Sequence, residues 1–200
     1  MQVSNEHSLI SQNIYFNLMT SLTERNAKAT LGSGCFWCTE AVFKRIRGVS
    51  ELKSGYTGGK IKNPTYREVC SGLTGHAEAI QLTYDPAVVS YEDLLAVFFY
   101  THDPTTLNRQ GNDVGTQYRS AIFFHDEIQA TLAQAFIQKL TDERVYDSAI
   151  VTEVRPLTVF YEAELYHQDY YDRNTDQAYC SFVISPKLEK LRKRFSGLLK

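Results

Sequence analysis

Residues Gly34 to Glu40 read Gly-Cys-Phe-Trp-Cys-Thr-Glu, and this heptad holds the side chain with the most distinctive chemistry. An apolar, β-leaning run from Ala27 to Leu31 and a Gly-Ser-Gly turn precede it, and an amphipathic stretch from Glu40 to Arg47 follows. This order predicts that Cys35 lies where a strand gives way to a helix, near unpaired backbone N–H groups. The positive end of the helix dipole favours thiolate over thiol, and the thiolate is the reactive form. We therefore expect Cys35 to be a nucleophile.

A second cysteine, Cys38, follows three residues later, about one helical turn along and on the same side as Cys35. The pair resembles a redox CxxC motif, in which the first cysteine attacks and the second resolves. A structural zinc site needs about four ligands. Neither a second CxxC nor an HxxxH occurs in the chain, and the five histidines show no metal spacing. The sequence therefore predicts redox chemistry without a metal.

Glu78 is the next informative residue. The even-numbered positions of the predicted strand 78–84 are Glu78, Ile80, Leu82 and Tyr84, so this carboxylate shares a face with apolar side chains. Burial disfavours the charged form and raises the pKa of a carboxyl group, as a general acid near neutral pH requires. A strand-end Glu that reaches water is the alternative, and alternation does not decide between the two.

Five further residues allow both a structural and a functional interpretation. Tyr66 and Tyr118 belong to a set of thirteen tyrosines, most of which must serve packing. Asp113 lies in Gly-Asn-Asp-Val-Gly, where a turn former is the ordinary interpretation. Phe36 and Trp37 are either core residues or the lining of a pocket that presents an apolar group to Cys35.

The overall composition is that of an ordinary globular protein. The chain has 200 residues, 43% of them hydrophobic, and a formal net charge of −2. Scattered Lys and Arg residues argue against a nucleic-acid partner, and no apolar window is long enough to cross a membrane. The N-terminus lacks a secretory pattern, and four cysteines in a chain of this length suit a reducing compartment. We expect a cytoplasmic protein and, for want of an unused apolar stripe, a monomer.

Strands and helices mix without strict alternation, which favours the α+β class. Residues 1–26 are predicted to be a polar arm, 27–185 the folded domain and 186–200 a basic C-terminal helix. Ser90-Tyr-Glu-Asp93 has the form of a capping box that opens a helix. The expected strands are 27–31, 49–55, 78–84, 120–124, 149–157 and 182–184, and the expected helices are 40–47, 64–69, 90–102, 127–140, 161–172 and 186–199.

Several segments together resemble the A-type peptide-methionine sulfoxide reductases, the MsrA family. The heptad is the first of them, and the others match in the same order, so that the resemblance covers about residues 29–185. The matching segments are Gly55-Tyr-Thr-Gly-Gly59, Asn63-Pro-Thr-Tyr-Arg-Glu-Val-Cys70, Thr74-Gly-His-Ala-Glu-Ala79, His102-Asp-Pro104, Gln110-Gly-Asn-Asp-Val-Gly-Thr-Gln-Tyr-Arg-Ser120, His167-Gln-Asp-Tyr170 and Tyr179-Cys180.

The resemblance implies a role for each candidate residue. Cys35 would attack the sulfur of methionine S-sulfoxide, peptide-bound or free, and become a sulfenic acid. Glu78 would protonate the sulfoxide oxygen with help from the hydroxyls of Tyr66 and Tyr118. The remaining positions would bind the substrate or resolve the sulfenic acid: Phe36 and Trp37 around the S-methyl group, Asp113 at the polar part, and Cys180 as the resolving cysteine.

The family also implies a two-layer plait of the ferredoxin-like, split βαβ type around a mixed sheet with flanking helices. It implies thioredoxin or another dithiol as the reductant, oxidised proteins as substrates, and no metal or organic cofactor. Many members carry Gly where Cys38 stands, so Cys38 is an alternative resolving residue, although the position of Cys180 favours the latter. Cys70 is expected to be buried packing.

Two other functions fit parts of the pattern. A thioredoxin-like dithiol exchanger would use Cys35 and Cys38 on disulfides and would have little need of Glu78. A non-enzymatic module that binds methionine peptides would keep the pocket without turnover.

Overall fold

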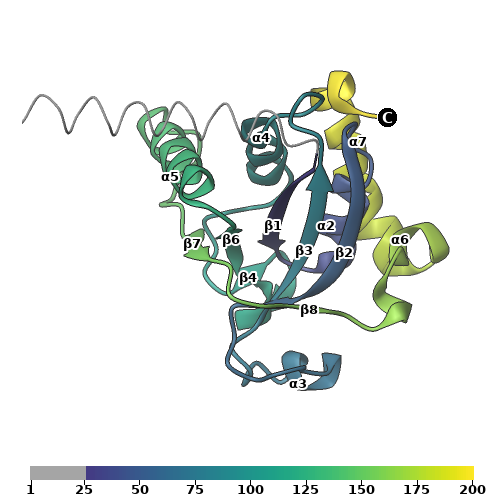
Figure 1. Ribbon diagram of the computed structural model, residues 1–200. Coiled ribbons are helices and arrows are strands. Elements are labelled where there is room, and N and C mark those ends of the chain that lie inside the picture. The colour runs from purple at the N-terminus through teal and green to yellow at the C-terminus, as the bar shows by residue number, and fades with distance from the viewer. Residues whose placement is uncertain (1–25) are drawn as a thin grey trace, which may run out of the picture.

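The computed structural model describes residues 26–200, and a six-stranded sheet with helices packed against it forms the centre of the fold (Figure 1). All but the last residue of the predicted N-terminal arm lies outside the described residues. The strands of this sheet are β1 (Ala27–Ser33), β2 (Val49–Thr57), β3 (Ala77–Tyr84), β6 (Ser120–Phe124), β7 (Glu153–Pro156) and β8 (Phe160–Glu162). A separate two-stranded ribbon pairs β4 (Arg109–Gln110) with β5 (Asp113–Val114).

The helices are α2 (Phe36–Phe43), α3 (Tyr66–Cys70), α4 (Tyr91–Thr101), α5 (Glu127–Asp142), α6 (Tyr170–Arg173) and α7 (Ser185–Phe195). The spatial order of the strands is β7-β6-β1-β3-β2-β8. Every pair in it is antiparallel except β6 with β7, which is parallel. The expected mixed sheet with flanking helices is confirmed.

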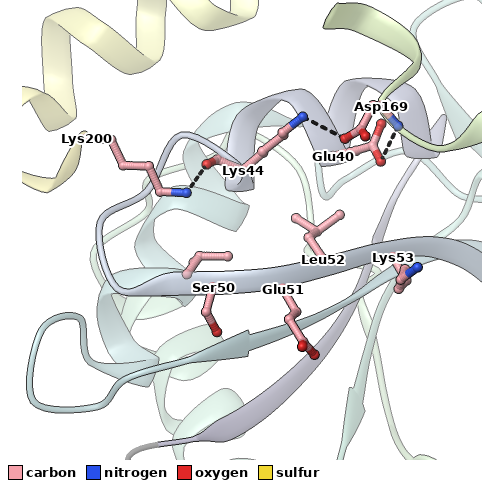
Figure 2. A pocket seen from close by; sticks show the side chains of 9 residues that line it. Glu40, Lys44, Ser50, Glu51, Leu52, Lys53, Asp169 and Lys200 are labelled. Atoms are coloured by element: carbon pink, nitrogen blue, oxygen red, sulfur yellow. Dashed lines mark hydrogen bonds and ion pairs between the residues drawn. The ribbon is translucent and has the colours of Figure 1, made fainter.

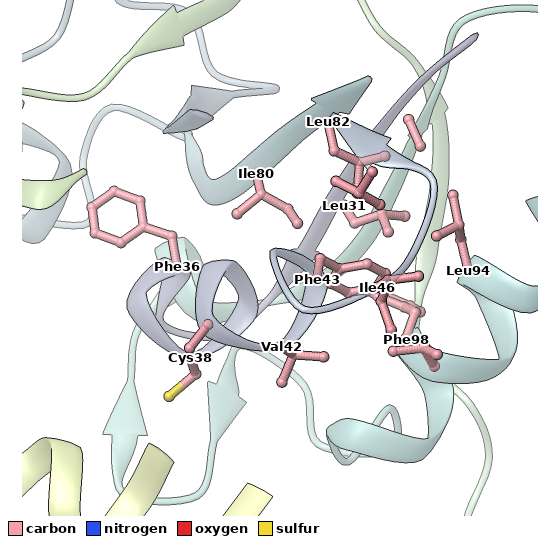
Figure 3. Close-up of a cluster of buried hydrophobic side chains, with 14 of the residues drawn as sticks. Leu31, Phe36, Cys38, Val42, Phe43, Ile46, Ile80, Leu82, Leu94 and Phe98 are labelled. Atoms are coloured by element: carbon pink, nitrogen blue, oxygen red, sulfur yellow. The ribbon is translucent and has the colours of Figure 1, made fainter. Parts of the chain in front are cut away.

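The main hydrophobic core lies on the face of the sheet that α2, α4 and α7 cover. The alternation predicted for β3 holds, because Ile80, Leu82 and Tyr84 are all buried in this core. Figure 3 shows Leu31, Phe43 and Ile80 meeting between α2 and the sheet. Helix α7 buries Leu188 and Leu191 in the same cluster, so the C-terminal segment is part of this domain's core.

Helix α4 begins where the sequence predicts. The Ser90 hydroxyl accepts a bond from the Asp93 backbone N–H at 3.0 Å, and the Asp93 carboxylate accepts one from the Ser90 N–H at 3.1 Å. The capping box therefore satisfies two donors at the start of the helix, with Asp in place of the usual Glu or Gln.

The opposite face of the sheet carries small side chains around one large one. Ala77, Ala79 and Ala121 surround Phe123 there, and Leu157 and Phe160 pack against them. The chain from β7 to β8 crosses this face, and Figure 1 shows it passing in front of the sheet at one end. Because small residues leave room for that crossing segment, one short stretch reaches both edges of the sheet.

Two sequence-based expectations about the C-terminal third are wrong. The predicted helix 161–172 is instead the end of β8, a 3-10 turn over Leu165–His167 and the short helix α6. The Gln168 side chain binds backbone groups of Ser54 and Ala163, and these tertiary bonds replace a helical ladder. The predicted strand at 182–184 is part of a π-helical turn, Cys180–Ile184, that leads directly into α7.

Candidate active site

Cys35 occupies the predicted junction between β1 and α2. It is the N-cap residue of α2, and its carbonyl accepts backbone bonds from Cys38 at 3.1 Å and Thr39 at 3.3 Å. The helix starts earlier than the predicted 40–47 and ends at Phe43. The side chain of Cys35 is 8% exposed, so the sulfur lies at the edge of the core rather than on open surface.

The turn before Cys35 depends on glycine. Gly34 has a φ of +91°, and a Cβ at this position would lie 2.6 Å from Cβ of Gln110. L-residues adopt such a φ at a cost, because the Cβ atom clashes with the backbone. Gly34 therefore allows the chain to leave β1 and place Cys35 at the start of α2.

Gly34→Ala is expected to destabilise the protein by about 1–3 kcal/mol, because it adds backbone strain and a steric clash with Gln110. Denaturant unfolding monitored by circular dichroism measures this change. Gly197→Ala is the matched control, since a Cβ there meets nothing within 4 Å. A Gly34→Ala protein as stable as the wild type would contradict this account of the turn.

The ionisation of the two neighbouring thiols differs from the sequence-based expectation. Burial raises the pKa of Cys35 well above its usual range, and the nearby Cys38 thiol adds to the rise. The pKa of Cys38 is lowered to about 7, first of all by its hydrogen bond with Cys35. Burial of the Cys35 sulfur thus opposes the thiolate form that the start of α2 was predicted to favour.

Glu78 lies directly beneath the start of α2. Its Oε2 atom accepts a bond from the Phe36 backbone N–H at 3.0 Å, and the residue is 1% exposed. Burial is the main cause that raises the pKa of Glu78 from 4.5 to about 8, and the charges of Asp113 and Cys38 act in the same direction. The carboxyl group is therefore protonated near neutral pH. The alternative, a Glu at the end of a strand that reaches water, is excluded by its burial.

The two predicted tyrosines are half-buried near these groups. Burial is the largest cause that raises the pKa of Tyr66 and of Tyr118, and the charge of Glu78 raises both further. Tyr66 also stacks against Phe36, with ring centroids 6.5 Å apart. Both phenols consequently remain protonated and able to donate a hydrogen bond at any ordinary pH.

Phe36 and Trp37 form the apolar side of the site together with His167, just before α6, and Tyr170, the first residue of α6. Trp37 stacks on Tyr170 with ring centroids 3.6 Å apart and an interplanar angle of 5°. Its indole Nε1 donates a 3.0 Å hydrogen bond to His167 Nδ1. The His167 ring also packs against that of Phe36, with ring centroids 5.1 Å apart. Figure 3 shows Phe36 and Cys38 projecting from α2 away from the cluster around Phe43.

His167 and Tyr170 were not singled out individually by the sequence reasoning. They fall within the segment predicted as a helix, and only their membership of a matching family segment, His167 to Tyr170, marked them. Their position beside Trp37 depends on tertiary contacts across 130 residues, which local patterns do not reveal.

Asp113 is the first residue of β5 in the two-stranded ribbon, and its carboxylate faces the C-terminal segment. Its Oδ2 atom accepts a 2.8 Å bond from the Tyr179 hydroxyl, which in turn lies 3.6 Å from Cys38 Sγ. Tyr179 is the other residue that the sequence reasoning left without a role. It connects the C-terminal segment to the CxxC pair.

The other two cysteines differ in their surroundings. Cys180 is fully buried in the main core, and burial followed by the charge of Cys38 raises the pKa of its thiol. Cys70 is exposed at the end of α3, so the expectation that it is buried packing is wrong. The five-residue helix α3 buries only Val69. All four thiols are free.

Within residues 26–200, no group of three or more His, Cys, Asp or Glu side chains is arranged to hold a metal ion. The same part of the chain contains no helix with the length and apolar character that a membrane crossing demands.

Comparison with known proteins identifies the family. The model of the peptide methionine sulfoxide reductase family matches residues 27–198. The chain belongs to this family. The resemblance predicted from the sequence is confirmed, and the protein is an enzyme that reduces methionine sulfoxide.

The relatives match over most of their length. The peptide methionine sulfoxide reductase MsrA of Saccharolobus solfataricus is 54% identical over 172 residues, which cover 86% of this chain and 96% of the relative. The reduced form of Mxr1 from Saccharomyces cerevisiae has a TM-score of 0.72 and 35% identity, and covers 79% of this chain and 91% of its own. The structure of Saccharomyces cerevisiae Mxr1 in complex with Trx2 has a TM-score of 0.52 and 27% identity. The match covers 74% of this chain and 86% of the Mxr1 chain.

Proposed function

We propose that this reductase acts on the S-epimer of methionine sulfoxide, in proteins and as the free amino acid, through nucleophilic attack by Cys35. The observation that carries the proposal is the buried Glu78 carboxyl, protonated near neutral pH, bonded to the residue next to the nucleophile. A sulfoxide is a poor electrophile until its oxygen accepts a proton or a strong hydrogen bond. A neutral carboxyl beside a thiol supplies that proton where attack occurs.

The first step moves two protons. Cys38, as the thiolate, takes the proton of the Cys35 thiol, and the Cys35 sulfur attacks the sulfur of the sulfoxide. Glu78 gives its proton to the sulfoxide oxygen, with Tyr66 and Tyr118 as further donors. The oxygen is transferred to Cys35, methionine leaves, and Cys35 becomes a sulfenic acid while Glu78 becomes a carboxylate.

The substrate side chain lies against the aromatic residues. Phe36 and Trp37 contact the S-methyl group. The Asp113 carboxylate orients the polar part of the substrate, and it either keeps or gives up its hydrogen bond from Tyr179 when the substrate binds. His167 and Tyr170 already hold the Trp37 ring, so its orientation is set before substrate binds.

For the second step we propose Cys38 as the residue that resolves the sulfenic acid. Both thiols are buried, but Cys38 lies one helical turn from Cys35 and its thiol hydrogen-bonds to that of Cys35, whereas the thiol of Cys180 is influenced by Cys38. The Cys38 thiol condenses with the sulfenic acid, which forms a disulfide and releases water. Cys180, which the sequence favoured for this role, is the alternative.

Cys38→Ser is therefore expected to release about one methionine per enzyme, more slowly than the wild type because the base for Cys35 is gone, and then to stop, while Cys180→Ser continues to turn over with thioredoxin. The reason is that the sulfenic acid on Cys35 can be reduced by thioredoxin only after the resolving cysteine has converted it to a disulfide, and Cys180 is not that residue in this proposal. Product release measured in a single turnover, and then with thioredoxin and its reductase present, separates the two steps. The opposite pattern, with recycling lost only in Cys180→Ser, would assign the role to Cys180.

A thioredoxin-type dithiol is the reductant that we propose, and the structure of yeast Mxr1 in complex with Trx2 supports it. The proposed chemistry uses only sulfur, carboxyl and phenol groups, and therefore needs neither a metal nor an organic cofactor. We also propose a cytoplasmic monomer.

We further infer that the core of the fold is the two-layer, split βαβ plait. The crossovers β1-α2-β2 and β3-α4-β6 interleave to give the strand order β6-β1-β3-β2, which supports this interpretation. Such interleaving brings Cys35 at the end of β1 beside Glu78 in the neighbouring β3.

A further inference from the structure

Glu40, the last residue of the heptad, has no part in the chemistry described so far, yet its carboxylate is buried in an unusual place. The residue lies in α2 and is 2% exposed. Its Oε1 atom accepts the backbone N–H of Asp169 at 2.9 Å, and its Oε2 atom accepts that of Tyr170 at 3.1 Å. Figure 2 shows Glu40 pointing toward Asp169 from across the gap between the two segments.

The backbone that Glu40 binds has no cap of its own. Asp169 has a φ of +56° and is the N-cap residue of α6, and its side chain makes no capping bond. Its carboxylate is turned instead to Lys44, whose Nζ lies 2.6 Å away. Glu40 therefore supplies from α2 the acceptors that this turn lacks.

Tyr170, the residue held at its N–H by Glu40, is also the residue whose ring stacks on Trp37. Trp37 and Glu40 are three residues apart in α2 and so lie on the same side of that helix. The helix thus contacts one short segment in two ways, through the aromatic face and indole bond of Trp37 and through the carboxylate of Glu40.

Burying a carboxylate is costly unless hydrogen bonds replace its hydration. Burial raises the pKa of Glu40, and the two backbone bonds and Lys44 act against that rise. An apolar residue would fill this position without that cost, but it would leave two backbone N–H groups unpaired.

We propose that Glu40 is a positioning residue: it fixes the backbone at Asp169 and Tyr170, and thereby fixes the Tyr170–Trp37 ring pair that forms the apolar side of the substrate pocket. The proposal rests on the proposed role of Trp37 in binding the S-methyl group. It concerns how firmly that pocket is held and leaves the roles of Cys35 and Glu78 unchanged.

Trp37 is the only tryptophan in the chain, so its fluorescence reports on the ring pair directly. In Glu40→Gln, one oxygen becomes an amide donor that cannot accept a backbone N–H. We expect a shift in the Trp37 emission maximum and a rise in KM for methionine sulfoxide of about tenfold, with kcat within about twofold of the wild type. The rate at which iodoacetamide alkylates Cys35 should not change.

Glu51→Gln is the matched control, because Glu51 lines the same hollow in Figure 2 but is exposed on β2. It should leave emission and KM unchanged. If Glu40→Gln also leaves both unchanged, the proposal is wrong. An equal fall in kcat and in alkylation rate would overturn it too, since that result points to general damage at α2.

Two further variants keep the test decisive. Tyr170→Ala removes the stacked ring but not the backbone N–H groups, and it should shift the emission and raise KM in the same way even if Glu40→Gln does not fold. Unchanged values in Tyr170→Ala would overturn the proposal. Trp37→Ala tests the proposed pocket separately: a wild-type KM there refutes the role of Trp37 itself, whatever Glu40→Gln shows.

Discussion

Cys35→Ser is expected to lose methionine sulfoxide turnover by about 10⁴-fold or more, because a serine hydroxyl can neither attack the sulfoxide sulfur at neutral pH nor carry the transferred oxygen. The assay is reduction of a dabsylated methionine sulfoxide with dithiothreitol. The loss should not come from unfolding. Cys35 is an N-cap residue without a side-chain capping bond, and serine is among the best N-cap residues. The melting temperature of the variant should therefore equal or exceed that of the wild type.

Cys70→Ser is the control for this experiment, since Cys70 is an exposed thiol on α3 and has no role in the proposed reaction. It should retain wild-type turnover. Wild-type activity in Cys35→Ser would refute the assignment of Cys35 as the nucleophile. A different choice of resolving cysteine could not explain that result.

Glu78→Gln has the second large expected effect, a fall in kcat of about 10²-fold or more with little change in KM. Glutamine keeps an acceptor for the Phe36 N–H but has no acidic proton for the sulfoxide oxygen. Steady-state kinetics on the same substrate measure the change. A dithiol exchanger built on Cys35 and Cys38 would be indifferent to this substitution, so undiminished turnover would contradict the proposed acid.

The pH dependence of activity and stability provides a second test of Glu78. Wild-type kcat should fall as the pH rises through about 8, because the carboxyl then loses the proton that it must donate. The same shift lowers stability: between pH 4.5 and about 8 the unfolded chain releases this proton while the folded protein retains it. The stability contributed by Glu78 is therefore complete below about 4.5 and lost as the pH rises to about 8. Glu78→Gln should gain stability relative to wild type across this range, as denaturant midpoints will show.

Much of the first two-thirds of the fold follows from local pattern. The alternation in 78–84 predicted the strand and placed Glu78 on its apolar face, although it did not decide whether the carboxylate is buried, and Ser90 with Asp93 predicted the start of α4. The Gly-Ser-Gly turn before the heptad placed Cys35 at a junction of strand and helix. These features depend on residues that are neighbours in the chain, so sequence is sufficient to find them.

The rest depends on contacts between distant segments. The segment 161–172 has helical composition, but two long-range hydrogen bonds hold it in turns. One joins Gln168 to Ser54, and the other joins Glu40 to Asp169. The thiolate of Cys35 was predicted from the helix dipole, a local property, whereas the burial that raises the pKa of this thiol comes from the core packed around it. Tyr179 reaches Asp113 only because the C-terminal segment folds back over α2.

The path of the chain from β7 to β8 has a consequence for the behaviour of this protein at high concentration. An open sheet presents unpaired backbone groups along its outer strands, where another chain can add and aggregation can begin. Here both outer strands come from one stretch, 153–162, and both are short, with Pro156 at the end of one of them. A cut in residues 157–159 would loosen both outer strands at once and uncover the longer strands β6 and β2, so this one link keeps both edges of the sheet covered.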